Sequence, residues 1–136
     1  MINLKSGLVR LFLIAAFASA FHGAAVAQQI SLLCVTKYSD FVNNIRDVAV
    51  DGVIVKVTGK NVNVINAAEF SSNNLNLYET TVFGDDSIRF KNKSKPLYSG
   101  FINRYSGKIS ISEWSDDEKR LLKLLEGNCE LANKKF

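Results

Sequence analysis

Alternating apolar and polar positions across residues 97–112 predict a half-buried β-hairpin. The alternation continues on both sides of Arg104-Tyr105-Ser106-Gly107, where the chain must turn. Gly107 suits this turn because short hairpin loops often require a residue at positive φ, which glycine adopts without steric cost. We expect the rest of the fold to be organised around this hairpin.

The same alternation predicts a second hairpin from residues 52–58 and 62–65, with a turn at Thr58-Gly59-Lys60-Asn61. Further strands are predicted over residues 30–37, 75–82 and 87–91, with a polar loop at 71–74 and a turn at 84–86. The stretch from Tyr38 to Val50 combines helical spacing with β-branched residues. We interpret it as a turn with a short helix, and its structure stays open at this point.

After Trp114 the hydrophobic period becomes that of a helix. Ser115 followed by Glu118 three residues later is the capping-box pattern that starts many helices. Gly127 is placed as the C-terminal stop, and one apolar face is formed by Leu121, Leu122, Leu124 and Leu125. The pattern predicts a short α-helix of about 11 residues.

Short strands at regular spacing with turn residues between them predict a mainly β fold. The expected architecture is a single antiparallel meander closed as a sandwich or small barrel, with the C-terminal α-helix covering one end or edge. The alternation does not separate a filled interior from a hollow one, because both require the same pattern.

Residues 1–27 are predicted to be a signal peptide. Lys5 and Arg10 form a positive start, an apolar run follows, and Ala25-Val26-Ala27 supplies the small-x-small cleavage pattern. A membrane span needs about 20 apolar residues, and this run is shorter. We therefore expect one domain over residues 28–136, periplasmic or secreted, with no transmembrane anchor in the mature chain.

The chain contains two cysteines, Cys34 and Cys129, near the two ends of the mature domain. In an oxidising compartment such a pair is expected to form one disulfide. Because no Cys-x-x-Cys motif is present, a structural bond is favoured over a redox role.

Several short motifs run along the mature chain: Leu32-Leu33-Cys34, Ile88-Arg89-Phe90, the Gly-Phe-Ile-Asn-Arg-Tyr-Ser-Gly segment at residues 100–107, Gly127-Asn128-Cys129, and the terminal Lys135-Phe136. In these motifs the chain resembles a loose group of small uncharacterised exported bacterial proteins. The resemblance implies export and a β-domain with paired cysteines, and it implies no activity. The Leu-rich segment before Cys129 is an addition to the group's pattern.

The only histidine, His22, lies in the predicted leader. The mature chain therefore lacks the imidazole that serine triads, cysteine–histidine pairs and histidine-ligated zinc require. We predict no enzyme, no cofactor and no metal site. The distant alternative is a carboxylate-based hydrolase built on Asp85, Asp86 and Glu113, although adjacent aspartates are typical of a turn.

Four cations at two-residue spacing form the one unusual surface feature: Arg89, Lys91, Lys93 and Lys95. On a strand they fall on one face. One hypothesis is an edge strand protected against aggregation, and this is the one the sequence favours. The other is contact with an anionic envelope component or an acidic protein. Of 17 basic residues, Lys5 and Arg10 lie in the leader, which leaves 15 against 13 acidic ones. So small an excess makes nucleic acid an unexpected partner.

Arg104 and Tyr105, at the tip of the organising hairpin, have the composition of an interface hot spot. We interpret the chain as a small exported binding or interaction module without catalytic machinery, whose partner and oligomeric state the sequence does not give. The alternative is a small β-barrel that carries an apolar ligand inside.

Overall fold

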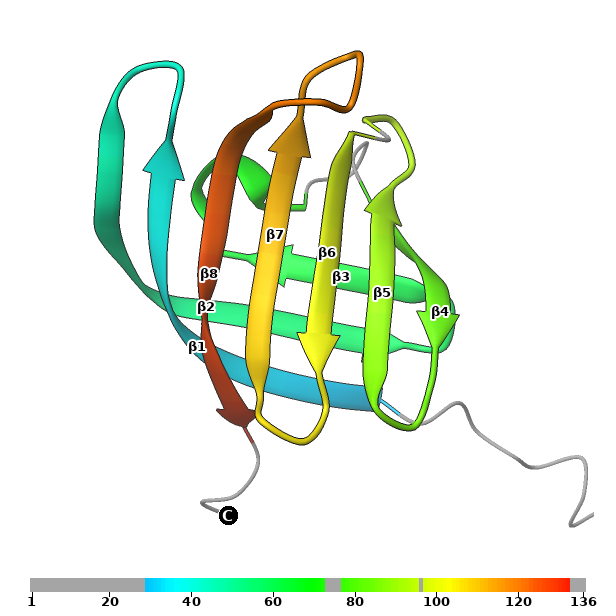
Figure 1. The fold of residues 1–136 in the computed structure, drawn as a ribbon. Coiled ribbons are helices and arrows are strands. Elements are labelled where there is room, and N and C mark those ends of the chain that lie inside the picture. Colours follow the sequence, from blue (N-terminus) through cyan, green and yellow to red (C-terminus); the bar gives the residue numbers. More distant parts are fainter. Residues whose placement is uncertain (1–28, 73–76, 96, 133–136) are drawn as a thin grey trace, which may run out of the picture.

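A computed structural model describes residues 29–72, 77–95 and 97–132, and the predicted signal peptide lies outside these ranges (Figure 1). Eight antiparallel strands follow one another in chain order and close into a single barrel, with the last strand beside the first. They are β1 (Gln29–Asp40), β2 (Ile45–Thr58), β3 (Asn61–Ile65), β4 (Tyr78–Phe83), β5 (Ser87–Asn92), β6 (Tyr98–Asn103), β7 (Lys108–Trp114) and β8 (Leu121–Leu131), with the 3-10 helix η1 (Ala68–Phe70) between β3 and β4. The predicted antiparallel meander is confirmed, and its closure is that of a barrel.

The organising hairpin is confirmed as β6 and β7, which pair antiparallel. Gly107 has φ +74°, as the turn requires. The side-chain oxygen of Asn103 accepts hydrogen bonds from the backbone N–H groups of Tyr105 and Ser106, each at 3.0 Å. The second predicted hairpin is confirmed as β2 and β3, with Thr58 opposite Asn61.

The stretch from Tyr38 to Val50 forms no helix. It holds the end of β1, a tight turn and the start of β2, and it projects from the barrel at the upper left of Figure 1. The Asp40 carboxylate organises the turn by accepting N–H groups from Val42 at 3.0 Å and Asn43 at 3.1 Å. The side-chain amide of Asn43 also donates to this carboxylate, which lowers the pKa of Asp40. The β-branched residues, rather than the helical spacing, indicated the correct structure.

Two β-bulges bend this hairpin. The pairing of β1 with β2 shifts between Cys34 and Thr36, and again between Tyr38 and Asp40. The extra residues on β2 include one at positive φ at each bulge, Gly52 at +74° and Asp47 at +51°. Bulges of this kind increase local twist and redirect a strand. They carry β1 and β2 from the barrel wall into the projecting hairpin.

The predicted C-terminal helix is wrong. Residues 115–120 form a loop, and the leucine-rich segment is β8, which pairs with both β7 and β1. Ser115 closes the loop instead of capping a helix: its hydroxyl donates to the Asp117 carboxylate and accepts the N–H of Arg120 at 3.1 Å. Capping residues form such local loops as readily as helix starts. A strand in this position completes the hydrogen bonds of two neighbours, which a short isolated helix does not offer.

Inward-facing side chains of the described residues pack together inside the barrel. Tyr78 lies against Phe90 with ring centroids 5.4 Å apart, and Phe70 of η1 lies 5.3 Å from Tyr98. Seventeen buried hydrophobic residues among those described form one cluster: Cys34, Tyr38, Val53, Val55, Val57, Val62, Val64, Ala67, Phe70, Tyr78, Ile88, Phe90, Tyr98, Ile102, Ile109, Ile111 and Leu125.

The predicted disulfide between Cys34 and Cys129 is confirmed. The two residues lie directly opposite each other on β1 and β8, with a Cα–Cα distance of 4.0 Å. The bond therefore joins the first and last strands of the meander, at the seam where the barrel closes. Within the described ranges, no helix has the length and apolar character needed to cross a membrane.

Candidate binding surface

The predicted basic stripe divides into two parts. Arg89 and Lys91 lie on the exposed outer side of β5, whereas Lys93 and Lys95 follow the strand in a loop. The strand ends because the Asn92 side-chain oxygen accepts the N–H groups of Ser94 and Lys95, each at 3.0 Å. Two of the four predicted cations therefore share a strand face.

β5 is an interior strand of the sheet. It pairs with β4 on one side and with β6 on the other. A strand paired on both sides presents no open backbone edge for aggregation. Edge protection therefore does not explain the exposed cations Arg89 and Lys91.

A hollow of about 280 Å³ lies on the outer surface beside these two cations. We call it the β5–β7 hollow; it is lined by Thr81, Arg89, Phe90, Lys91, Ser99, Gly100, Phe101, Ser110 and Ser112. It thus holds two cations and four hydroxyl side chains, and none of its lining residues is acidic. The guanidinium of Arg89 lies 5.3 Å from the centre of the Phe101 ring, an orienting cation–π contact.

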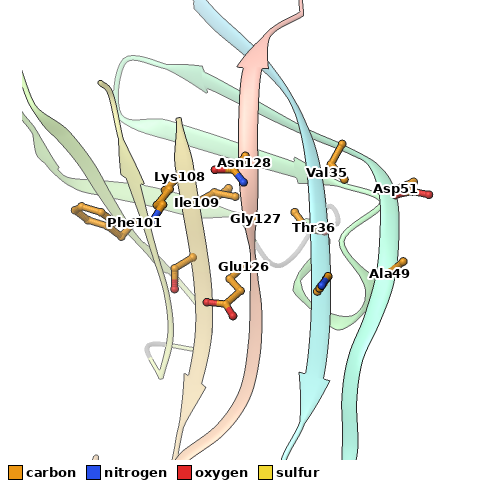
Figure 2. Close-up of a pocket in the computed structure, with 12 residues that line it drawn as sticks. Val35, Thr36, Ala49, Asp51, Phe101, Lys108, Ile109, Glu126, Gly127 and Asn128 are labelled. Atoms are coloured by element: carbon orange, nitrogen blue, oxygen red, sulfur yellow. The ribbon is translucent and has the colours of Figure 1, made fainter. Parts of the chain in front are cut away.

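A larger groove of about 660 Å³ adjoins this hollow over β8. Figure 2 shows Val35, Ala49 and Asp51 on one side of the β8 groove, and Phe101 and Lys108 on the other. Its charged residues are Lys37, Asp51, Lys108 and Glu126. Among the described residues, none of these four takes part in an ion pair.

A third hollow, of about 230 Å³, continues the surface in the other direction. It is lined by Lys91, Leu97, Ser99, Trp114 and Glu118. Lys91 and Ser99 also line the β5–β7 hollow, which in turn shares Phe101 and Ser110 with the β8 groove. The three hollows therefore adjoin one another along β1, β8, β7, β6 and β5, with Ala49 and Asp51 of β2 and Thr81 of β4 at their margins. We call the three hollows together the outer track.

Both residues of the predicted interface pair at the hairpin tip are exposed, but Arg104 is engaged within the molecule. The Arg104 guanidinium donates to the Gly84 carbonyl at 2.8 Å and lies 5.3 Å from the centre of the Phe83 ring. Arg104 therefore ties the β6–β7 turn to the β4–β5 turn. Tyr105 projects into solvent with 82% of its surface exposed, and the half-exposed Phe83 is an aromatic neighbour of this tip that sequence reasoning missed.

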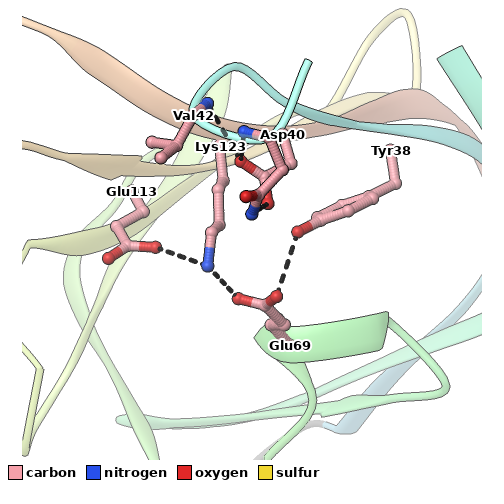
Figure 3. A network of polar contacts seen from close by, with 7 residues as sticks. Tyr38, Asp40, Val42, Glu69, Glu113 and Lys123 are labelled. Atoms are coloured by element: carbon pink, nitrogen blue, oxygen red, sulfur yellow. Dashed lines mark hydrogen bonds and ion pairs between the residues drawn. The ribbon is translucent and has the colours of Figure 1, made fainter. Parts of the chain in front are cut away.

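A polar network closes the opposite end of the barrel (Figure 3). The Lys123 ammonium contacts the Glu69 carboxylate and lies 3.6 Å from Glu113 Oε2, while the Tyr38 hydroxyl donates to Glu69 at 3.3 Å. These contacts attach η1 to β1, β7 and β8. The hydrogen bond to Glu69 raises the pKa of Lys123, and burial, aided by the charge of Glu69, raises the pKa of Tyr38 to about 12.

Sequence reasoning missed this network because the predicted helix spanned the segment that contains Lys123, and no element was assigned to Glu69. No local motif joins residues 54 positions apart. Only the barrel topology brings them together.

The network makes stability sensitive to alkaline pH. An unfolded tyrosine ionises near pH 10, whereas Tyr38 in the fold ionises at about pH 12. Between these values the folded state keeps a proton that the unfolded state loses, so the free energy of unfolding falls as pH rises. We expect Tyr38→Phe to show a smaller loss between pH 9 and pH 11, measured by urea unfolding. Tyr105→Phe is the matched control at an exposed ring, and identical pH profiles for Tyr38→Phe and wild type would contradict the assignment.

The three carboxylates of the hydrolase alternative are not brought together. Asp85 and Asp86 lie in the β4–β5 turn at the bottom of the barrel in Figure 1, whereas Glu113 lies near the top of β7 and faces Lys123. In the described ranges no group of three or more His, Cys, Asp or Glu residues is placed to hold a metal ion.

Compared with known proteins, the chain matches no protein-family model, no curated protein and no solved structure.

Proposed function

We propose that this protein is an exported, non-catalytic binding module that holds an anionic partner on the outer surface of its barrel. One observation carries the proposal: the β5–β7 hollow presents Arg89 and Lys91 with no acidic lining residue, on a strand whose two edges are both paired. An anionic ligand supplies the charge that the hollow lacks.

Local charge partners do not account for the two cations. Glu79 lies opposite Lys91 on β4, yet neither Lys91 nor Arg89 forms an ion pair within the described part of the chain. Like charges two positions apart on one strand face repel each other. Arg89 has no acidic residue opposite it, since it faces Val82 on β4 and Phe101 on β6, so its charge is the less compensated of the two.

The packed core cluster is our reason for preferring an outer site over the alternative of an apolar carrier. A carrier of a small apolar molecule needs a cavity of about 300 Å³ or more. Buried side chains from the strands and from η1 occupy the interior of the described barrel, whereas the hollows of the outer track lie on its outer face. The disulfide at the barrel seam supports export, because such bonds persist in oxidising compartments.

The proposal is tested by removing both charges with Arg89→Gln and Lys91→Gln. At 0.1 M salt we expect retention on two anionic probes, phosphatidylglycerol vesicles and an immobilised polyuronate, to weaken severalfold on at least one, since each exposed charge contact contributes about 0.2–1 kcal/mol. Wild-type retention is also expected to fall steeply toward 1 M salt, where the Debye length is about 3 Å.

The matched control is Lys60→Gln with Lys119→Gln, which removes the same charge from exposed positions outside the outer track. Melting temperatures of both variants should stay close to wild type. Equal retention of the two double variants on both probes, or equal wild-type retention at both salt concentrations, would refute the proposal.

A further inference from the structure

We infer that the anionic partner is a linear saccharide bearing carboxylate, sulfate or phosphate groups, bound along the outer track. The inference rests on the proposed function, because it names the ligand class of the same surface. It is carried by the shape of the track, by its row of hydroxyl side chains, by the two aromatic rings that flank them, and by its charge density.

The shape favours a linear chain over a bilayer. Three hollows of about 660, 280 and 230 Å³ adjoin through shared residues and follow one another across the strands from β1 and β8 to β5. A polymer lying across the strands fills such a track, with successive units in successive hollows. A flat membrane surface contacts protruding side chains and leaves a concave track unfilled.

The centre of the track is lined by small hydroxyl side chains. Ser99 and Ser112 lie opposite each other on β6 and β7, with their hydroxyl oxygens 3.5 Å apart. Ser110, also on β7, lies opposite Phe101. Each hydroxyl both donates and accepts hydrogen bonds, as the hydroxyl groups of a sugar do. The Ser99–Ser112 pair contributes to the pairing of β6 and β7, and both side chains also line the β5–β7 hollow.

Two aromatic rings flank the hydroxyl row. Phe101 lines both the β5–β7 hollow and the β8 groove. Trp114 lines the third hollow with 36% of its surface exposed, and its indole N–H donates to the Ser112 hydroxyl at 3.1 Å. Rigid aromatic faces beside hydrogen-bonding groups provide apolar contact at low entropic cost. The C–H faces of sugar rings match them.

The charge density favours a saccharide over a nucleic acid. The lining residues of the track carry four cations, Lys37, Arg89, Lys91 and Lys108, against the acidic residues Asp51, Glu118 and Glu126. A further hollow of about 440 Å³ shares Leu97 and Trp114 with the third one and adds Arg120 together with Glu113, Asp116 and Asp117, so acidic residues outnumber cations over the whole surface. Only the central hollow has cations alone. Nucleic acids carry one charge per nucleotide of each strand and require more cations along the path. A saccharide with spaced anionic groups can place one charged group in the β5–β7 hollow and neutral units in the hollows on either side.

The experiment measures binding of the full mature protein to a linear polyuronate, to its methyl-esterified neutral form, and to phosphatidylglycerol vesicles. The test variant is Ser99→Ala with Ser112→Ala, which removes hydroxyls and no charge. We expect its affinity for the polyuronate to fall about tenfold, as for the loss of about two hydrogen bonds, while its vesicle retention stays at the wild-type level. The control is Ser31→Ala with Thr58→Ala, which removes two hydroxyls from the outer side of β1 and β2. A second variant, Trp114→Leu, is expected to lose polyuronate affinity without change of charge, and it keeps the inference testable if the serine variant folds poorly.

The outcomes distinguish failure of the saccharide inference from failure of the proposed function. Wild-type binding to vesicles but not to the polyuronate overturns the saccharide inference and leaves the proposed function standing. Binding to neither anionic probe overturns both. Equal affinity for the charged and esterified polymers would show that the ligand need not be anionic, which contradicts both the proposed function and the saccharide inference. Unchanged polyuronate affinity in the serine and tryptophan variants would show that the saccharide does not bind in the outer track. Selective binding to the polyuronate, lost in these variants, supports the inference.

Discussion

Removal of the disulfide by Cys34→Ala and Cys129→Ala is expected to lower the free energy of unfolding by about 2–5 kcal/mol, the range typical of native disulfides in small secreted domains. The bond joins residues 95 positions apart. Loops of this length lose the most chain entropy in the unfolded state when they are cross-linked. For a domain whose total stability is about 5–15 kcal/mol, the loss is a large share.

The position of the bond adds a second reason for a large effect. Cys34 is fully buried, and it faces Cys129 across the β1–β8 seam that closes the barrel. Strands that are distant in sequence pair at a high entropic cost, which the cross-link removes in advance. The bond therefore stabilises the one strand pair that the order of the meander leaves furthest apart.

Urea unfolding of the oxidised wild type, the reduced wild type and the double variant measures this effect. We expect the reduced wild type and the double variant to unfold at similar, lower urea concentrations, and a reductant to leave the double variant unchanged. Thiol alkylation of the unreduced mature protein should find no reactive thiol. One reactive thiol per chain, or a double variant as stable as the oxidised wild type, would contradict a structural role for the bond.

Local signals in the sequence were sufficient where neighbouring residues form the element. The β6–β7 hairpin required only alternation and a glycine at the turn, both of which lie within residues 97–112. The disulfide prediction followed from the expected export and a pair of cysteines, without any knowledge of register. Hairpin turns and disulfide formation follow the same local rules whatever the overall fold.

Local signals failed where distant strands determine the structure. The segment from Ser115 to Gly127 satisfies several rules for a helix, yet its leucines belong to β8 because β1 and β7 both need a partner there. Leu125 points into the core and is fully buried. Tertiary pairing overrides local propensity in such segments, and no residue pattern within the segment itself predicts that pairing.

The candidate surface was predictable in part. Arg89 and Lys91 stood out in the sequence, but the choice between edge protection and binding required the pairing of β5 with two neighbours. The serine row was readable once the register of β6 and β7 was assumed, because Ser99 and Ser112 then lie opposite each other on the outer face. The β8 groove was not readable, since it depends on the closure of β8 against β1.

Gly127→Ala is expected to destabilise the barrel by about 3 kcal/mol, which corresponds to a fall in melting temperature of roughly 15 °C for a domain of this size. The sequence suggested that Gly127 ends a helix, whereas in the barrel it lies in β8 opposite Thr36 of β1. A Cβ atom at this position would lie 2.0 Å from the carbonyl oxygen of Val35 and 2.7 Å from the Cα of Thr36. Both are backbone atoms, so no side-chain rotation relieves the overlap. The strands would have to separate at the seam.

Gly84→Ala is the matched control. Its added Cβ would meet its nearest atoms at 3.3 and 3.4 Å, one of them the terminal oxygen of the Asp86 side chain, which can rotate away. We expect this control to shift the melting temperature by only a few degrees.

The two glycine variants are measured by thermal unfolding, with and without the disulfide. Because Gly127 and the disulfide act on the same β1–β8 seam, we expect their effects to be non-additive, unlike those of distant sites. Equal melting temperatures for Gly127→Ala and Gly84→Ala would show that the seam tolerates an extra atom, and would contradict the close approach of β1 and β8.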